Sequence, residues 1–143
     1  MRVFLDTWVL IEKYKGNPDA EGLLEAAKSE HEAHISLITV AELMNVISRE
    51  YGEREARVQH AYLRRSPLIR EPVTEEIARD AGLLKTRYRF SLADALILST
   101  AMARKADVLL TGGDKQYEKE WKDVTEMQVL KLSDFMKNSS LVQ

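Results

Sequence analysis

The stretch RVFLDTWVLIE, residues 2–12, places one acid directly after a short apolar segment and then resumes with apolar residues. Residues 2–6 are typical of a short buried strand, and a helical stretch follows from Thr7 and stops at Gly16. A single carboxylate at a strand end often does no more than cap the next helix. The role of Asp6 therefore depends on whether other acids of the chain occupy equivalent places.

The rest of the chain alternates short apolar segments with amphipathic ones. Strands are expected at HISLI (34–38), DVLLT (107–111) and MQVLKL (127–132), and LIREPV (68–73) is expected as a strand or an extended link. Helices are expected at 17 to about 30, 39–52, 53–65, 75–88, 91–105, 115–121 and from Ser133 onward. This alternation predicts an α/β fold with a central, mostly parallel, twisted sheet of about four to five short strands and helices on both faces.

Length and composition limit the kinds of protein that the chain can be. With 143 residues and 45% hydrophobic content, one domain over residues 1–143 is expected. The absence of cysteine excludes disulfide scaffolds, thiolate zinc sites and cysteine nucleophiles. The first residues lack a secretory-signal pattern, and no apolar run approaches the roughly 18 residues of a membrane span. We therefore expect a cytoplasmic protein without membrane contact.

Charge is distributed unevenly. The net charge of −2 argues against a protein that coats nucleic acid by bulk attraction. Residues 54–89, however, hold nine Lys or Arg against five acids. This segment could form a surface that faces a polyanion, or it could be a solvated helical face.

Four acids fall at comparable places in the predicted fold. Asp6 closes the first strand, and Glu42 lies in the first turn of the helix that follows the second. Asp94 opens the helix at 91–105, and Asp114 lies in the turn after the DVLLT strand. Ligands of open parallel sheets bind outside the carboxyl ends of the strands, where the following helices begin. The four carboxylates are therefore expected to converge.

Each acid alone also has a purely structural explanation. Thr39 to Glu42 and Ser91 to Asp94 both have the spacing of a capping box, in which Ser or Thr is followed three residues later by an acid. The other two acids would suit a helix cap or a turn. The case for a common site rests on the four positions taken together.

Convergence of four carboxylates requires protons or a cation. Two unit charges about 4 Å apart repel by roughly 4 kcal/mol at an effective dielectric near 20, and a domain is only about 5–15 kcal/mol stable. His31, His34 and His60 share no ligand spacing and are expected at the surface or at strand edges. Oxygen ligands alone favour Mg²⁺ or Mn²⁺ over zinc, and such ions commonly meet their substrates through phosphate oxygens. The pattern therefore favours phosphoryl chemistry.

The segments that carry these acids resemble the PIN domain family, and specifically its short single-domain VapC-type toxins. The matching segments are FLDTWVLI (4–11), ISLITVAELMNVI (35–47) and SLADALILSTAMARKADVLLTGGD (91–114). The resemblance covers essentially the whole chain and implies a single PIN-like nuclease domain. It also implies that Asp6, Glu42, Asp94 and Asp114 form the family's catalytic, metal-binding quartet. Thr7 then corresponds to the hydroxyl residue that commonly follows the first acid.

The sequence departs from the family pattern at two places. Similar members usually have Thr or Ser two positions before the last acid, whereas TGGD leaves Thr111 three positions before Asp114. Trp8 is bulky where a small polar residue is frequent, although Tyr117 keeps the aromatic expected three positions after the last acid. Glu118 is a candidate to compensate for the altered turn.

The resemblance implies a metal-dependent endoribonuclease that hydrolyses phosphodiester bonds of single-stranded or looped RNA and leaves 5′-phosphate and 3′-hydroxyl ends. Glu42 is the expected orienting group for the attacking water. Arg64, Arg65, Arg87 and Arg89 are candidates for binding RNA phosphates. The family's toxins are held inactive by an antitoxin, which implies a VapB-like partner, and they commonly form homodimers.

Three other functions compete with a toxin ribonuclease. One is a PIN ribonuclease of RNA processing or decay, and another is a catalytically degenerate PIN-like binding module. The third is a haloacid-dehalogenase-type phosphatase, whose first strand also ends in a catalytic Asp. That fold needs a second Asp two residues later, where this chain has Trp8.

Overall fold

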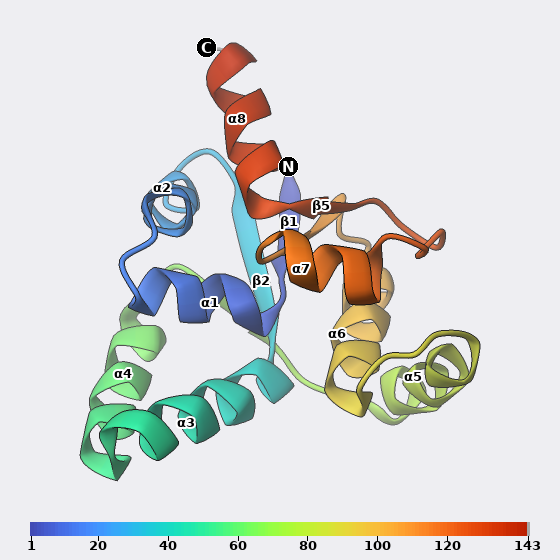
Figure 1. The fold of residues 1–143 in the computed structure, drawn as a ribbon, viewed down its shortest axis with the longest axis horizontal. Helices are drawn as coiled ribbons and strands as arrows, with labels where there is room; N and C mark the ends of the chain where they lie inside the picture. The colour runs from blue at the N-terminus through green and yellow to red at the C-terminus, as the bar shows by residue number, and fades with distance from the viewer. Residues whose placement is uncertain (143) are drawn as a thin grey trace.

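The computed structural model describes the backbone of residues 1–142 and the side chains of residues 1–138. In these residues, five parallel strands form one sheet in the order β3-β2-β1-β4-β5 (Figure 1). The strands are β1 (Arg2–Leu5), β2 (Glu32–Ser36), β3 (Ile69–Glu71), β4 (Val108–Thr111) and β5 (Val129–Lys131). The helices are α1 (Thr7–Tyr14), α2 (Pro18–Ala26), α3 (Leu37–Tyr51), α4 (Glu53–Arg65), α5 (Glu75–Arg87), α6 (Leu92–Ala103), α7 (Asp114–Gln116), the π-helical turn η1 (Tyr117–Trp121) and α8 (Leu132–Val142).

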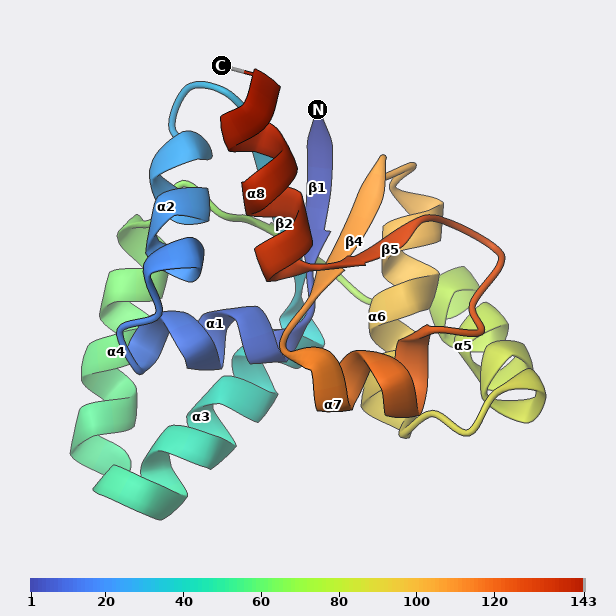
Figure 2. The ribbon, with the colours of Figure 1, turned by 45° about the horizontal axis from the view of Figure 1, so that its top comes forward.

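Helices cover both faces of the sheet, because successive strand side chains point to opposite faces. In β1, Val3 and Leu5 pack in a core with residues of α1–α4 and α8. Phe4, between them, packs in a second core with α5, α6 and Trp121. Figures 1 and 2 show these two groups of helices on either side of the strands. The predicted fold class is confirmed.

None of the helices within residues 1–142 is long and apolar enough to cross a membrane.

The boundary between β2 and α3 differs from the sequence prediction. Ser36 ends the strand and caps the helix, because its hydroxyl accepts a hydrogen bond from the Ile38 N–H at 3.1 Å. Thr39 therefore lies inside α3 and does not cap it, so the capping box expected from Thr39 to Glu42 is absent. The box expected at Ser91 is half formed: its hydroxyl accepts from the Asp94 N–H at 3.1 Å.

His34 is buried, contrary to the surface or edge position expected from the sequence. Its Nδ1 lies 2.7 Å from Glu71 Oε1, and its Nε2 lies 2.5 Å from Glu32 Oε1. Arg104 Nε is 2.9 Å from the second oxygen of Glu71, and Arg2 Nε is 2.8 Å from Glu32 Oε1. This network links β1, β2, β3 and the end of α6, and so it holds one half of the sheet in register.

We expect Glu71→Ala to lower the free energy of unfolding by about 3 kcal/mol, because it removes the partner of the buried His34 Nδ1 and of the half-buried Arg104 guanidinium. Glu53→Ala is the matched control: its ion pair with Arg57 is exposed, so the loss should stay below about 0.5 kcal/mol. Urea denaturation of the three proteins measures both values. Equal stability of the two variants would contradict a structural role for the His34 network.

Candidate functional site

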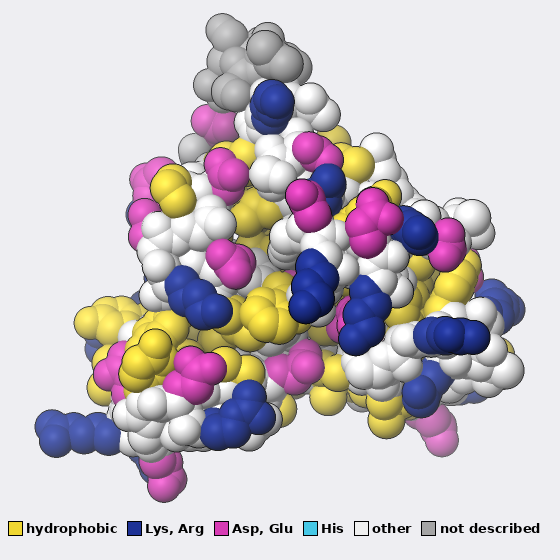
Figure 3. Space-filling model, viewed as in Figure 1, with side chains coloured by type: hydrophobic (Ala, Val, Ile, Leu, Met, Phe, Trp, Pro, Cys, Tyr) yellow, Lys and Arg dark blue, Asp and Glu magenta, His cyan; other side chains and the backbone are white. Residues whose placement is uncertain are grey.

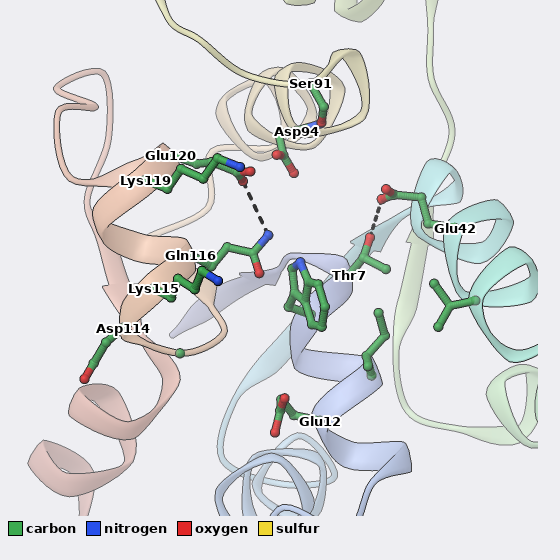
Figure 4. A pocket seen from close by; sticks show the side chains of 14 residues that line it. Thr7, Glu12, Glu42, Ser91, Asp94, Asp114, Lys115, Gln116, Lys119 and Glu120 are labelled. Atoms are coloured by element: carbon green, nitrogen blue, oxygen red, sulfur yellow. Dashed lines mark hydrogen bonds between the residues drawn. The ribbon is translucent and has the colours of Figure 1, made fainter. Parts of the chain in front are cut away.

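A pocket of about 670 Å³ opens at the carboxyl edge of the sheet. Its wall is formed by α1, the beginning of α3, the N-terminus of α6 and the segment 113–120 that follows β4 (Figure 4). α1, α3 and the segment 113–120 follow the strands β1, β2 and β4, and α6 precedes β4, with its N-terminus at the same edge of the parallel sheet. The acidic residues of this wall are Glu12, Glu42, Asp94, Asp114 and Glu120.

Asp6 lies at the end of β1 behind this wall and is 1% exposed. It caps α1, since its Oδ1 accepts a hydrogen bond from the Val9 N–H at 3.3 Å. Its Oδ2 is buried and has no hydrogen-bond partner among the described residues. Burial is the main cause that raises the pKa of Asp6 to about 8, and the charges of Glu120 and Glu42 contribute to this rise. Capping thus accounts for only one of the two Asp6 oxygens.

Thr7 holds Glu42 in place from the neighbouring helix. The Thr7 hydroxyl donates to Glu42 Oε1 at 2.5 Å and lies 3.0 Å from the Thr39 hydroxyl (Figure 4). Thr7 and Thr39 are both buried. This contact couples α1 to α3 and leaves the second oxygen of Glu42 available to a ligand in the pocket.

Asp94 and Glu120 form the most strongly interacting pair of acids. Burial raises the pKa of Asp94 to about 8, and so do its hydrogen bond to the Glu120 carboxyl group and the charges of Glu120 and Asp6. Gln116 Nε2 donates to Glu120 Oε2 at 3.4 Å and orients that carboxyl group (Figure 4). Glu120 therefore belongs to the acidic cluster, which we define as Asp6, Glu42, Asp94 and Glu120.

Asp114 does not join the acidic cluster, contrary to the expected convergence. Its side chain is 82% exposed, it pairs with Lys131 Nζ at 2.8 Å, and it points away from Asp94 and Glu120 (Figure 4). The physical reason is the turn before it. In the TGGD turn, Thr111 lies three residues before Asp114, one residue more than in similar family members. The helix α7 begins at Asp114 itself.

Two further residues that the sequence associates with this turn also lie apart from the pocket. Glu118 is exposed and pairs with Lys122 at 3.5 Å. Thr111 is buried at the end of β4, and its hydroxyl has no hydrogen-bond partner among the described residues. Neither side chain lines the pocket.

Glu120 was missed by sequence reasoning, although a helix at 115–121 was expected. Gln116 and Glu120 are four residues apart and share a helical face, which is the one signal that could have linked them. The chain forms a π turn at Tyr117–Trp121, where the Lys122 N–H bonds to the Tyr117 carbonyl at 3.0 Å. Such turns are rare and change which residues share a face. The α-helical period therefore could not assign Glu120 to the pocket.

The cations that line the pocket are Lys115 and Lys119. The four arginines proposed from the sequence as phosphate contacts are exposed, but none lines the pocket; they are Arg64, Arg65, Arg87 and Arg89. Arg87 is also paired with Glu126 at 3.3 Å. In Figure 3, Lys and Arg side chains stand over α7 and over α1, on either side of an apolar strip. The positive charge nearest the acidic cluster thus comes from the segment after β4.

The acidic cluster fits a hard divalent cation by its chemistry. All its donors are carboxylate oxygens, which Mg²⁺ and Mn²⁺ prefer, and Asp6 Oδ2 is buried without a partner. Among the described side chains, no three His, Asp or Glu are close enough together to hold an ion as they stand. Binding an ion therefore requires rotation of side chains around the pocket.

Comparison with known proteins gives a family and a set of similar structures. The model of the PIN domain family matches residues 3–122. A chain of a toxin-antitoxin complex from Klebsiella pneumoniae is 27% identical, with a TM-score of 0.62 over 88% of this chain and 98% of that one. A comparison with curated proteins finds no match.

Two more distant structures share the fold. DNA-bound VapBC from Salmonella typhimurium contains a chain with a TM-score of 0.74 at 17% identity, covering 92% of this chain and 98% of that chain. VapC20 from Mycobacterium tuberculosis, a toxin that cleaves the sarcin-ricin loop, has a TM-score of 0.65 at 19% identity over 88% and 98% of the two chains.

The raised pKa of Asp6 predicts a pH dependence of stability. Between the ordinary value of 3.8 and about 8, the folded chain keeps a proton that the unfolded chain releases. The free energy of unfolding should therefore fall as pH rises through this window. Asp6→Asn removes this contribution, so in EDTA the variant should be more stable than the wild type near pH 8, and the difference should shrink toward about pH 4.

Denaturant unfolding at several pH values measures this difference. Asp123→Asn, at an exposed acid, is the matched control and should follow the wild type throughout. Parallel pH profiles for the wild type and Asp6→Asn would contradict the raised pKa.

Proposed function

Because the chain belongs to the PIN domain family, we propose that it is a Mg²⁺- or Mn²⁺-dependent endoribonuclease and the toxin of a VapBC-type toxin–antitoxin pair. The observation that carries the proposal is the acidic cluster at the carboxyl edge of the sheet. Cleavage of the sarcin-ricin loop by the structurally similar VapC20 supports an RNA substrate. The family match does not support a haloacid-dehalogenase-type phosphatase.

Asp6, Asp94 and Glu120 are the residues that would hold the ion, with Asp6 as the central ligand. Asp6 is the least exposed of them and has an oxygen without a partner. A bound divalent cation lowers the pKa of a coordinated water and neutralises charge on the scissile phosphate. Without an ion, the carboxylates of the pocket repel one another. The same negative charge attracts a divalent cation.

Glu42 is the residue best placed to act on the attacking water. Its Oε1 accepts from Thr7, so its other oxygen can accept a proton from a water molecule in the pocket. Lys115 and Lys119 supply positive charge at the rim and would attract the RNA backbone. The acidic cluster would thus hold the ion, and the two lysines would bind the RNA backbone.

The biological role is proposed from the similar structures. Chains of toxin-antitoxin complexes match 88–93% of this chain. We therefore propose a VapB-like antitoxin as the partner that holds the enzyme inactive, a homodimeric state, and a cytoplasmic location, where RNA is accessible.

A catalytically degenerate PIN-like binding module is the second candidate, favoured by the displacement of Asp114 from the acidic cluster. The presence of Glu120 beside Asp94 argues against it, because the pocket keeps four acids. The two candidates differ in their response to divalent ions, since an ion that binds the folded state stabilises it.

We expect Glu120→Gln to weaken Mn²⁺ binding by about 10- to 100-fold and to reduce RNA cleavage, whereas Asp114→Asn should bind and cleave nearly as the wild type does. Mn²⁺ titration followed by thermal unfolding measures binding independently of activity. The reverse order of the two variants would show that Asp114, and not Glu120, completes the site. No stabilisation of the wild type by Mn²⁺ or Mg²⁺ would favour the degenerate module.

The toxin role predicts that induced expression of the wild type arrests bacterial growth and that Asp6→Asn does not, because the variant should lose metal-dependent cleavage. Growth curves and purified-protein cleavage assays measure the two effects separately. A wild type that cleaves RNA in vitro without arresting growth would identify a ribonuclease of RNA processing or decay.

A further inference from the structure

We propose that Trp8 is a stacking platform for an unpaired RNA base beside the scissile phosphate, and that it makes the pocket selective for single-stranded RNA. This inference rests on the proposed ribonuclease function. It concerns the residue at which the sequence departs from the small polar side chain frequent in similar proteins.

Trp8 is an exposed aromatic side chain in a pocket. It lines the pocket and is 39% exposed, whereas the other tryptophan, Trp121, is 1% exposed in the core. Trp8, Ile11 and Glu12 all line the pocket and have the spacing of one helical face. Trp8 shares the pocket with three members of the acidic cluster, Glu42, Asp94 and Glu120.

The pocket around the ring holds cations as well as the acids described above. Lys15 Nζ lies 5.9 Å from the centroid of the Trp8 ring, and Lys115 and Lys119 line the same pocket from the segment after β4. Figure 3 shows hydrophobic side chains over α1 with Lys and Arg side chains on both sides. An apolar ring between cations is the arrangement by which proteins hold single strands, because bases stack and phosphates pair with the cations. An apolar peptide would use the ring but not the lysines.

The TGGD turn passes close to the Cβ of Trp8. A Cβ at Gly112 would lie 2.9 Å from the Trp8 Cβ and 3.7 Å from its Cγ, so a glycine is needed where the turn passes the helix. The two departures from the family pattern, Trp8 and the longer turn, are therefore in contact.

Only an unpaired base can use such a platform. Bases within an A-form helix are stacked on one another, whereas bases of loops and single strands can be splayed onto an aromatic side chain. The platform therefore adds affinity for single strands and none for duplex.

The test measures RNA binding without cleavage, in the Asp6→Asn background and in EDTA. The probe is a short fluorescein-labelled RNA, single-stranded or annealed to its complement, followed by anisotropy. Replacing Trp8 with Leu should weaken single-strand binding by about 5- to 100-fold and leave duplex binding unchanged, and Trp8→Phe should recover most of the loss. Tyr62→Leu, at an aromatic residue that is 59% exposed outside this pocket, is the matched control and should have no effect.

Intrinsic fluorescence gives a second readout, since Trp8 is the exposed tryptophan and single-stranded RNA should quench it. Unchanged single-strand affinity in Trp8→Leu, or equal weakening for both probes, would overturn the stacking role. A Trp8→Leu variant that loses only antitoxin binding would overturn it in favour of a protein contact. If the wild type cleaves RNA with Mn²⁺ and Trp8→Leu binds single-stranded RNA normally, only the stacking role is contradicted. If the wild type neither binds nor cleaves RNA, the proposed ribonuclease function is contradicted as well.

Discussion

The buried carboxylate of Asp6 is the constraint on which the site depends. It lies at the end of the central strand β1, where one oxygen caps α1 and the other has no partner among the described residues. The sheet is parallel, so the helices that follow β1, β2 and β4 bring further acids to the same edge. Two unit charges about 4 Å apart repel by roughly 4 kcal/mol at an effective dielectric near 20, a large part of the stability of a domain. The fold tolerates this cluster only with protons or a cation in the pocket.

The hydrogen bonds around the cluster explain how a small domain keeps these acids in place. Thr7 ties Glu42 to the first turn of α1, and the Asp6 N–H bonds to the Leu110 carbonyl at 3.0 Å, which joins the ends of β1 and β4. Gln116 orients Glu120 from the turn that follows β4. Asp6, Glu42 and Glu120 are therefore held by neighbouring residues of the site, and the two hydrophobic cores fix the elements that carry them.

The sequence was sufficient to predict the alternation of strands and helices, because hydrophobic period determines it. It also placed Asp6, Glu42 and Asp94 at one edge of the sheet, because parallel strands end at the same edge. It was not sufficient for the fourth acid. One additional residue in the TGGD turn and one π turn decide whether Asp114 or Glu120 faces the pocket, and neither follows from periodicity. The arginines predicted to bind RNA do not line the pocket, for a related reason. Composition gives the number of cations in a segment but not the side of the molecule on which they lie.

The most direct test of a divalent-ion site is a crystal grown with Mn²⁺ and measured at a wavelength where manganese scatters anomalously. We expect a peak within bonding distance of Asp6 and Asp94, with Glu120 rotated toward it and Asp114 still paired with Lys131. An anomalous peak bound by Asp114 and remote from Asp6, or an ion-free pocket at millimolar Mn²⁺, would contradict it.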